Sequence, residues 1–132
     1  MLAGELGVAH RVAFPGQVRD MGPWYAAADA AVSSSRSEGL PFNIMEAMYR
    51  ELPVAATQVK GHTDLITHGQ TGLLFPFGDA QACAARLREL EVRPDMARQL
   101  GKAGARAVQQ YELERVLPQV MELYGELLPL PV

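Results

Sequence analysis

The chain has 132 residues and a net charge of −3, with 48% hydrophobic and 20% charged residues, which is typical of one globular domain. The 12 basic residues are mixed with the 15 acidic ones and form no basic block, which argues against a nucleic-acid-binding protein. No apolar stretch approaches the roughly 20 residues that span a bilayer, and the first residues lack the pattern of a signal peptide.

The first half of the chain alternates short apolar runs with helical segments. Both predicted helices begin with a proline, which is favoured at the first helical position. The pattern predicts strands at 11–14 (RVAF), 30–34 (AAVSS) and 53–57 (PVAAT), and helices at 23–29 and 41–50.

The second half is predicted to be mainly helical. A single helical turn at 64–69 and a strand at 71–76 come first. Asp79 is then a good N-cap for a helix that extends to about Leu90, with Cys83 and Leu87 on its inner face. Two more helices are predicted from their apolar inner faces. The first face is Met96, Leu100, Ala103, Ala107 and Tyr111, and the second is Leu113, Val116, Val120, Leu123 and Leu127. Pro118 predicts that the last helix kinks or begins near Leu117.

Strands that alternate with helices predict an α/β fold, with a Rossmann-like parallel sheet of about four strands and flanking helices. In such sheets ligands bind beyond the carboxyl ends of the strands. The segment SEGLPFNIMEAM, residues 37–48, follows the strand at 30–34 directly and therefore lies at such an end.

The helix that begins at Pro41 has no side chain before it that can cap its first turn. The backbone N–H groups of Phe42, Asn43 and Ile44 therefore need an outside partner, which is either water or an anion such as a phosphate. Gly39 allows a ligand to approach the backbone closely. Glu38 and Glu46 flank this turn as hydrogen-bond acceptors that suit the hydroxyl groups of a sugar or a ribose, so the segment favours a nucleotide-sugar.

Several segments together resemble the carboxyl-terminal domain of retaining GT-B glycosyltransferases of family four. The match includes RVAFPGQV, LPVAAT, GHTDLITHGQTGLLFPFGD and YELERVLPQVMELYGELL. WYAAADAAVSSSRSEGLPFNIMEAM resembles the E-x(7)-E signature region, with Glu38 and Glu46 as its two glutamates. Because these segments occur in order along nearly the whole chain, residues 1–132 are expected to form a single, partial domain of this kind.

The resemblance implies a role for each residue of the motif. Glu38 would be the catalytic residue and would accept hydrogen bonds from hydroxyls of the donor sugar, while Glu46 would hold the ribose. The sugar and diphosphate would face a donor-binding turn made of Gly39, Leu40, Pro41, Phe42 and Asn43.

A second loop would lie near the base of the nucleotide, and it contains Gly16, Gln17 and Val18. No essential metal or other cofactor is expected, because the family transfers sugars without one and because His10, His62 and His68 lack metal-ligand spacing. His62 is expected to be a solvated loop residue, and Trp24 and Tyr25 are expected to pack within a helix.

The sequence departs from the family pattern in two ways. Glu51 stands where the family has glycine, which costs about 1 kcal/mol if the backbone there is left-handed. The amino-terminal acceptor domain and the first two strands of the carboxyl-terminal domain, with their basic pair for the diphosphate, are expected to be missing. The isolated chain is therefore expected to lack turnover, and a noncatalytic nucleotide-binding or interaction module remains the alternative.

The missing strands would leave open sheet edges. The strand at 11–14 could move beside the strand at 30–34, or two chains could pair their edges as a homodimer. The single cysteine, Cys83, fits a reducing cytoplasm, with the full-length enzyme either free or peripheral to the inner face of the membrane. The sugar, the base and the acceptor are not specified by these patterns.

Overall fold

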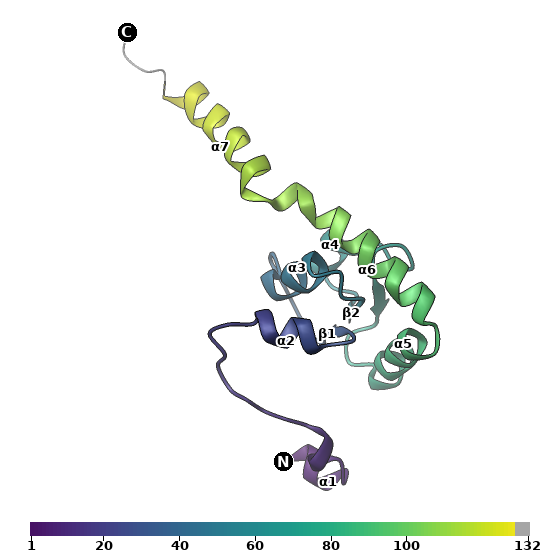
Figure 1. Ribbon diagram of the computed structural model, residues 1–132. Coiled ribbons are helices and arrows are strands. Elements are labelled where there is room, and N and C mark those ends of the chain that lie inside the picture. The colour runs from purple at the N-terminus through teal and green to yellow at the C-terminus, as the bar shows by residue number, and fades with distance from the viewer. Residues whose placement is uncertain (129–132) are drawn as a thin grey trace.

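A parallel three-stranded sheet forms the centre of the protein in a computed structural model that describes residues 1–128 (Figure 1). Its strands are β1 (Ala31–Ser33), β2 (Val54–Thr57) and β3 (Leu73–Phe75), in that spatial order. Both pairs are parallel, with Ala31 opposite Val54 and Ala55 opposite Leu73. The predicted α/β, Rossmann-like class is therefore confirmed, with three strands instead of about four in this part of the chain.

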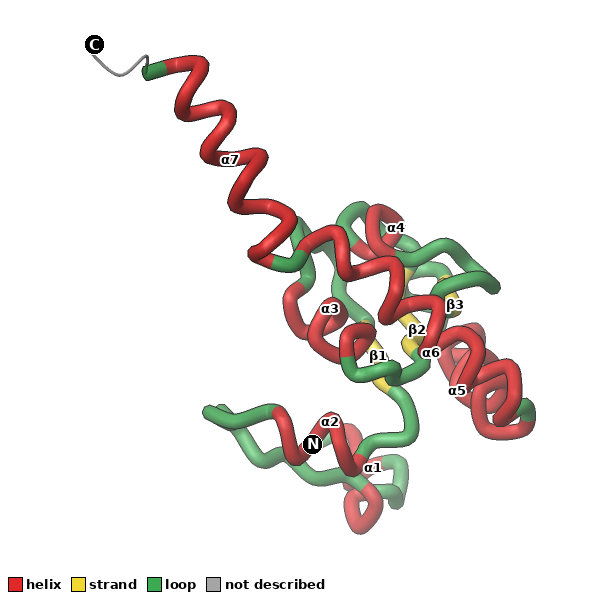
Figure 2. Tube along the Cα trace, turned by 45° about the horizontal axis from the view of Figure 1, so that its top comes forward, coloured by secondary structure: helices red, strands yellow, loops and turns green. Residues whose placement is uncertain are grey.

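Helices connect and flank the strands (Figure 2). The α-helices are α1 (Leu2–Glu5), α2 (Gly22–Ala27), α3 (Phe42–Tyr49), α4 (His62–Leu65), α5 (Ala80–Val92), α6 (Pro94–Val108) and α7 (Leu113–Leu127). Two short 3₁₀ helices, η1 (Ala9–Arg11) and η2 (Gln109–Tyr111), complete the described elements. The side chain of Asp79 accepts a hydrogen bond from the N–H of Ala82, so the predicted cap of α5 is confirmed. None of these helices is both long and apolar enough to cross a membrane.

Two apolar clusters cover opposite faces of the sheet. Alternate residues of β2 supply both, because successive side chains of a strand point to opposite faces. Val54 and Ala56 pack with Ile44 and Met48 of α3, whereas Ala55 packs with Leu73 and Phe75 of β3 and with α5 and α6. The sheet is thus buried on both sides at β2, as expected for a doubly wound fold.

Helix α6 packs closely on the corner that follows α3. A Cβ atom at Gly101 would overlap the carbonyl oxygen of Glu51, so only glycine fits there. Glu51 itself has φ 59°, so its backbone is left-handed and the cost stated for a non-glycine residue there applies. The inner face of α6 is Ala97, Leu100, Gly101, Gly104 and Val108. The observed face is rotated by about one residue from the predicted one, because Gly101 and Gly104 have no apolar side chain and yet make close contacts.

The strand predicted at residues 11–14 is wrong. Arg11 ends the 3₁₀ helix η1, residues 12–14 make no ladder with any described strand, and Val12 and Phe14 are exposed. A strand needs a partner for its backbone groups, and the segment lies away from β1, between α1 and α2 (Figure 1). The proposed movement of this segment to the edge of β1 is therefore also wrong.

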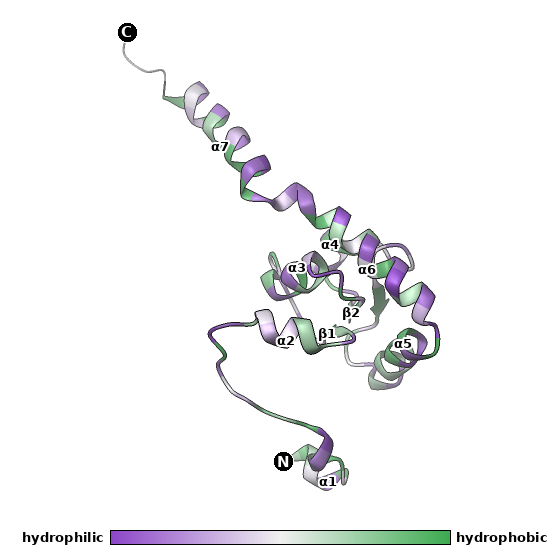
Figure 3. Ribbon diagram, viewed as in Figure 1, coloured by the Kyte–Doolittle hydropathy of each residue, from purple (hydrophilic) through white to green (hydrophobic). Residues whose placement is uncertain are grey.

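Two helix predictions need correction. The helical turn begins at His62 and ends at Leu65, earlier than the predicted 64–69, because Gly61 with φ 89° precedes it as the N-cap. Helix α7 begins at Leu113, with Pro118 inside it, and none of its residues is buried. Val116 is half-buried, but the other four residues of the expected inner face are exposed because α7 projects away from the sheet. Hydrophobic and hydrophilic residues alternate along the helix (Figure 3).

The left-handed backbone at Glu51 leads to a stability prediction. We expect Glu51→Gly to raise the free energy of unfolding by about 0.5–1 kcal/mol, since glycine removes the left-handed strain but loses more entropy on folding. The measurement is urea denaturation. Glu51→Ala is the matched control, because it removes the same exposed side chain and keeps the strain. Equal stability of the glycine and alanine variants would contradict the prediction.

Candidate functional site

The loop that carries Glu38 is fixed to the end of the neighbouring strand. The hydroxyl of Thr57, the last residue of β2, donates to the carbonyl oxygen of Ser35 at 2.6 Å. A Cβ atom at Gly61 would lie 2.8 Å from the Cβ and carbonyl oxygen of Glu38, and also from the carbonyl oxygen of Gly39. The loops after β1 and β2 therefore form one packed unit at the carboxyl edge of the sheet.

His62 supports this unit from inside the protein. Its side chain is fully buried, so the expectation of a solvated loop histidine is wrong. Nδ1 lies 2.9 Å from the carbonyl oxygen of Thr57 and therefore carries the proton, because a carbonyl only accepts. Nε2 is buried and has no hydrogen-bond partner among the described residues.

The first turn of α3 is uncapped by any side chain, as the sequence predicted. Pro41 occupies the N-cap and is buried. The N–H of Ile44 donates to the carbonyl oxygen of Pro41 at 3.1 Å, so its predicted need for an outside partner is wrong. Within residues 1–128, the N–H groups of Phe42 and Asn43 have no such acceptor and remain available to a ligand.

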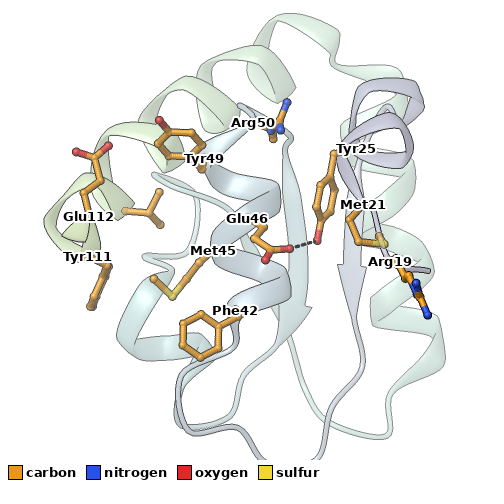
Figure 4. A pocket seen from close by; sticks show the side chains of 12 residues that line it. Arg19, Met21, Tyr25, Phe42, Met45, Glu46, Tyr49, Arg50, Tyr111 and Glu112 are labelled. Atoms are coloured by element: carbon orange, nitrogen blue, oxygen red, sulfur yellow. Dashed lines mark hydrogen bonds between the residues drawn. The ribbon is translucent and has the colours of Figure 1, made fainter. Parts of the chain in front are cut away.

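Glu46 projects from the outer face of α3 toward α2, where it meets Tyr25 (Figure 4). The Tyr25 hydroxyl donates to Oε2 of Glu46 at 2.9 Å, and the carbonyl oxygen of Asn43 lies 3.3 Å from the same hydroxyl. Burial, followed by this hydrogen bond and the charge of Glu46, raises the pKa of Tyr25 from its ordinary value of 10.0 to about 12. The expected packing of Tyr25 is confirmed, since its ring lies against the apolar cluster that contains Ile44 and Met48.

A cavity of about 520 Å³ opens beside Glu46, along the outer face of α3. Of the predicted site residues, only Phe42 and Glu46 line it. The other lining residues are Arg19, Met21, Gly22, Tyr25, Met45, Tyr49, Arg50, Val108, Tyr111 and Glu112. The cavity therefore combines one carboxylate of the motif with aromatic rings and guanidinium groups that the sequence pattern did not identify.

The remaining predicted residues lie outside this cavity. Glu38 is half-buried in the loop that packs on Gly61, and Leu40 is exposed beside it. Gly16 and Gln17 are exposed and Val18 is half-buried, on the segment that leads to Arg19 at the rim of the cavity.

A second cavity, of about 360 Å³, lies at the carboxyl ends of the strands. Ser34, Thr57 and Phe75 line it from the sheet, and Phe77, Asp79 and Cys83 line it from the turn and helix that follow β3. It lies at the edge of the sheet where ligands of such folds bind, and none of the predicted site residues lines it. In the described part of the chain, no three His, Cys, Asp or Glu side chains gather to hold a metal ion.

These features define a Rossmann-like α/β domain. The uncapped first turn of α3 and the carboxylates of Glu38 and Glu46 lie at and near the carboxyl edge of its sheet. The chain belongs to the family described as Glycosyl transferases group 1, because residues 1–91 match that family. It is 34% identical over 124 residues to EpsD of Bacillus subtilis (strain 168), covering 94% of this chain and 32% of EpsD. The lipopolysaccharide core biosynthesis mannosyltransferase LpsB of Rhizobium meliloti (strain 1021) is 30% identical over 127 residues, covering 94% and 36%.

Solved structures give the same assignment and establish the GT-B type of the fold. Sucrose-phosphate synthase from Thermosynechococcus elongatus superposes with a TM-score of 0.90 at 35% identity, covering 96% of this chain and 32% of that one. The Anabaena protein Alr3699/HepE, in complex with UDP and glucose, gives 0.87 at 26% identity, covering 94% and 34%. The chain thus spans about a third of the length of the proteins it matches.

The hydrogen bond between Tyr25 and Glu46 leads to a prediction about titration. In ¹³C NMR of labelled tyrosine, we expect Tyr25 to titrate at about 12. Glu46→Gln should lower the pKa of Tyr25, because it removes the charge that disfavours the phenolate. Since the pKa is raised in the folded state, the stability that this proton provides is present below pH 10 and is lost as the pH rises from 10 to 12.

Glu112→Gln is the matched control for this titration, because Glu112 lines the same cavity and makes no hydrogen bond to Tyr25. An unchanged titration of Tyr25 in the Glu46→Gln variant would show that the two side chains do not interact in solution.

Proposed function

We propose that this chain is the donor-binding part of a retaining glycosyltransferase of family four, with Glu38 and Glu46 as its E-x(7)-E pair. It binds a nucleoside diphosphate sugar and needs no essential metal. Glu38 accepts hydrogen bonds from hydroxyls of the sugar and is the catalytic residue, and Glu46 holds the ribose. The turn from Gly39 to Asn43 faces the sugar and the diphosphate.

The observation that carries this proposal is the glycine at position 39. Gly39 has no left-handed φ, and nothing lies within 4 Å of the place where its Cβ would be. The described fold therefore gives no reason for glycine there, in contrast to Gly61 and Gly101. A ligand that approaches the backbone closely would be a reason for glycine at this position. The free N–H groups of Phe42 and Asn43, which suit an anion, follow three and four residues later.

The cavity beside Glu46 supports a nucleotide as that ligand. Arg19 and Arg50 provide positive charge, and Phe42, Tyr49 and Tyr111 provide aromatic surface. The segment Gly16–Val18 leads to Arg19 at the rim of this cavity and would contact the base. UDP is the first nucleotide to test, because Alr3699/HepE, which is similar over 94% of this chain, was solved with UDP and glucose.

The partners and location of the protein follow from the same proposal. An acceptor-binding domain would act with this chain, because its relatives are about three times as long. Retaining transfer needs an acceptor held in line with the donor, so we expect the 132-residue chain alone to transfer no sugar. A second copy that pairs along the free edge of β1, where Val32 is half-exposed, stays a prediction, as does a cytoplasmic location.

A noncatalytic nucleotide-binding module remains the alternative function. It would use the same turn and the same Glu46, so binding alone does not separate the two proposals. The two functions differ in whether a longer protein that contains this chain transfers a sugar. If the chain belongs to an active enzyme, Glu38→Gln in that longer protein would abolish transfer.

Binding is tested by titrating UDP into the ¹⁵N-labelled chain. We expect shifts of the Gly39, Phe42 and Asn43 amides, and we expect Glu38→Ala and Glu46→Ala each to weaken binding about 10- to 100-fold, the range for one charge-assisted hydrogen bond. Glu91→Ala, an exposed carboxylate on α5, is the control and should change nothing. If UDP, GDP and ADP all leave these amides unmoved at millimolar concentration, the proposed function is wrong.

A further inference from the structure

We propose that Tyr25 is the positioning residue for Glu46: its hydroxyl holds one oxygen of the carboxylate, so that the other oxygen is presented to the ribose diol of the ligand. Tyr25 would thereby set the preference for ribonucleotides over deoxyribonucleotides through the position of the Glu46 carboxylate. This inference rests on the proposed function, because it assumes that Glu46 receives the ribose.

The hydrogen bond joins the exposed side chain of Glu46 to the packed side chain of Tyr25. Glu46 lies on the exposed face of α3, where a glutamate side chain has several rotamers of similar energy. Tyr25 is half-buried and packs against the apolar cluster under α3, so its ring is held in place. The 2.9 Å hydrogen bond to Oε2 therefore selects one position of the carboxylate, and Oε1 has no partner among the described residues.

In the part of the chain that the structure describes, neither arginine that lines the cavity occupies the Glu46 carboxylate. Arg19 and Arg50 line the same cavity, and a guanidinium can occupy both oxygens of a carboxylate at once. Within residues 1–128, neither arginine forms an ion pair with Glu46. Glu46 thus accepts one hydrogen bond at Oε2, and a diol hydroxyl can use Oε1 as an acceptor.

Tyr25 also connects Glu46 to the start of α3. Its hydroxyl lies 3.3 Å from the carbonyl oxygen of Asn43, whose own N–H is one of the two free donors of that turn. The proton stays on the phenol at neutral pH, since the pKa of Tyr25 is raised to about 12. One side chain on α2 therefore fixes the proposed ribose acceptor relative to the turn that is proposed to face the diphosphate.

The test compares Tyr25→Phe with the unaltered chain for two ligands, UDP and 2′,3′-dideoxyuridine diphosphate. We expect Tyr25→Phe to weaken UDP binding about tenfold, equivalent to about 1.4 kcal/mol, and to leave binding of the dideoxy analogue within about twofold. Phenylalanine keeps the packed ring, and thermal denaturation checks that the fold is retained. Trp24→Phe, on an exposed side chain of the same helix, is the control and should leave both affinities unchanged.

A double variant separates positioning from a structural role. In the Glu46→Ala background, Tyr25→Phe should cause no further loss of UDP binding. If Tyr25→Phe binds UDP as well as the unaltered chain does, or weakens both ligands equally, the inference is overturned while the proposed function stands. If the unaltered chain binds none of UDP, GDP and ADP, both are overturned.

Discussion

The close approach of the Gly61 backbone to Glu38 is the constraint on which the arrangement of the candidate site depends. No side chain fits at Gly61, so the loops that follow β1 and β2 are in direct contact. Thr57 reinforces that contact through its hydrogen bond to Ser35, and His62 is buried against Thr57. Since β2 is buried along its whole length, the position of Glu38 is set by the core of the protein rather than by its own exposed loop.

Helix α3 explains why a carboxylate stands within an apolar run. Ile44, Ala47 and Met48 are separated by three and four residues and are buried against the sheet. Glu46 lies between them in the sequence but on the opposite face of the helix, where it is exposed. The apolar residues hold the helix in place, and the helix in turn presents Glu46 to Tyr25 and to the cavity.

Features with a local cause could be predicted from the sequence. Pro41 marks the start of α3, and Asp79 caps α5. Features that depend on distant residues could not. The segment 11–14 has the composition of a strand but no partner beside it, and His62 is buried by its contact with Thr57. The hydrogen bond between Tyr25 and Glu46 joins residues 21 positions apart, and no spacing rule predicts such a pair.

The site and the core are largely separate in energetic terms, and Tyr25 is the exception. Gly39 has no side chain and the side chain of Glu46 is exposed, so both residues contribute little to the buried surface that stabilises the fold. Tyr25 contributes to both, because its ring packs against the core and its hydroxyl bonds to Glu46. A substitution that removes the ring would therefore disturb stability and site together, whereas removal of the hydroxyl alone acts on the site. Removing the hydroxyl oxygen of Tyr25 is therefore the most selective change for testing the proposed binding while the packing of the domain is kept.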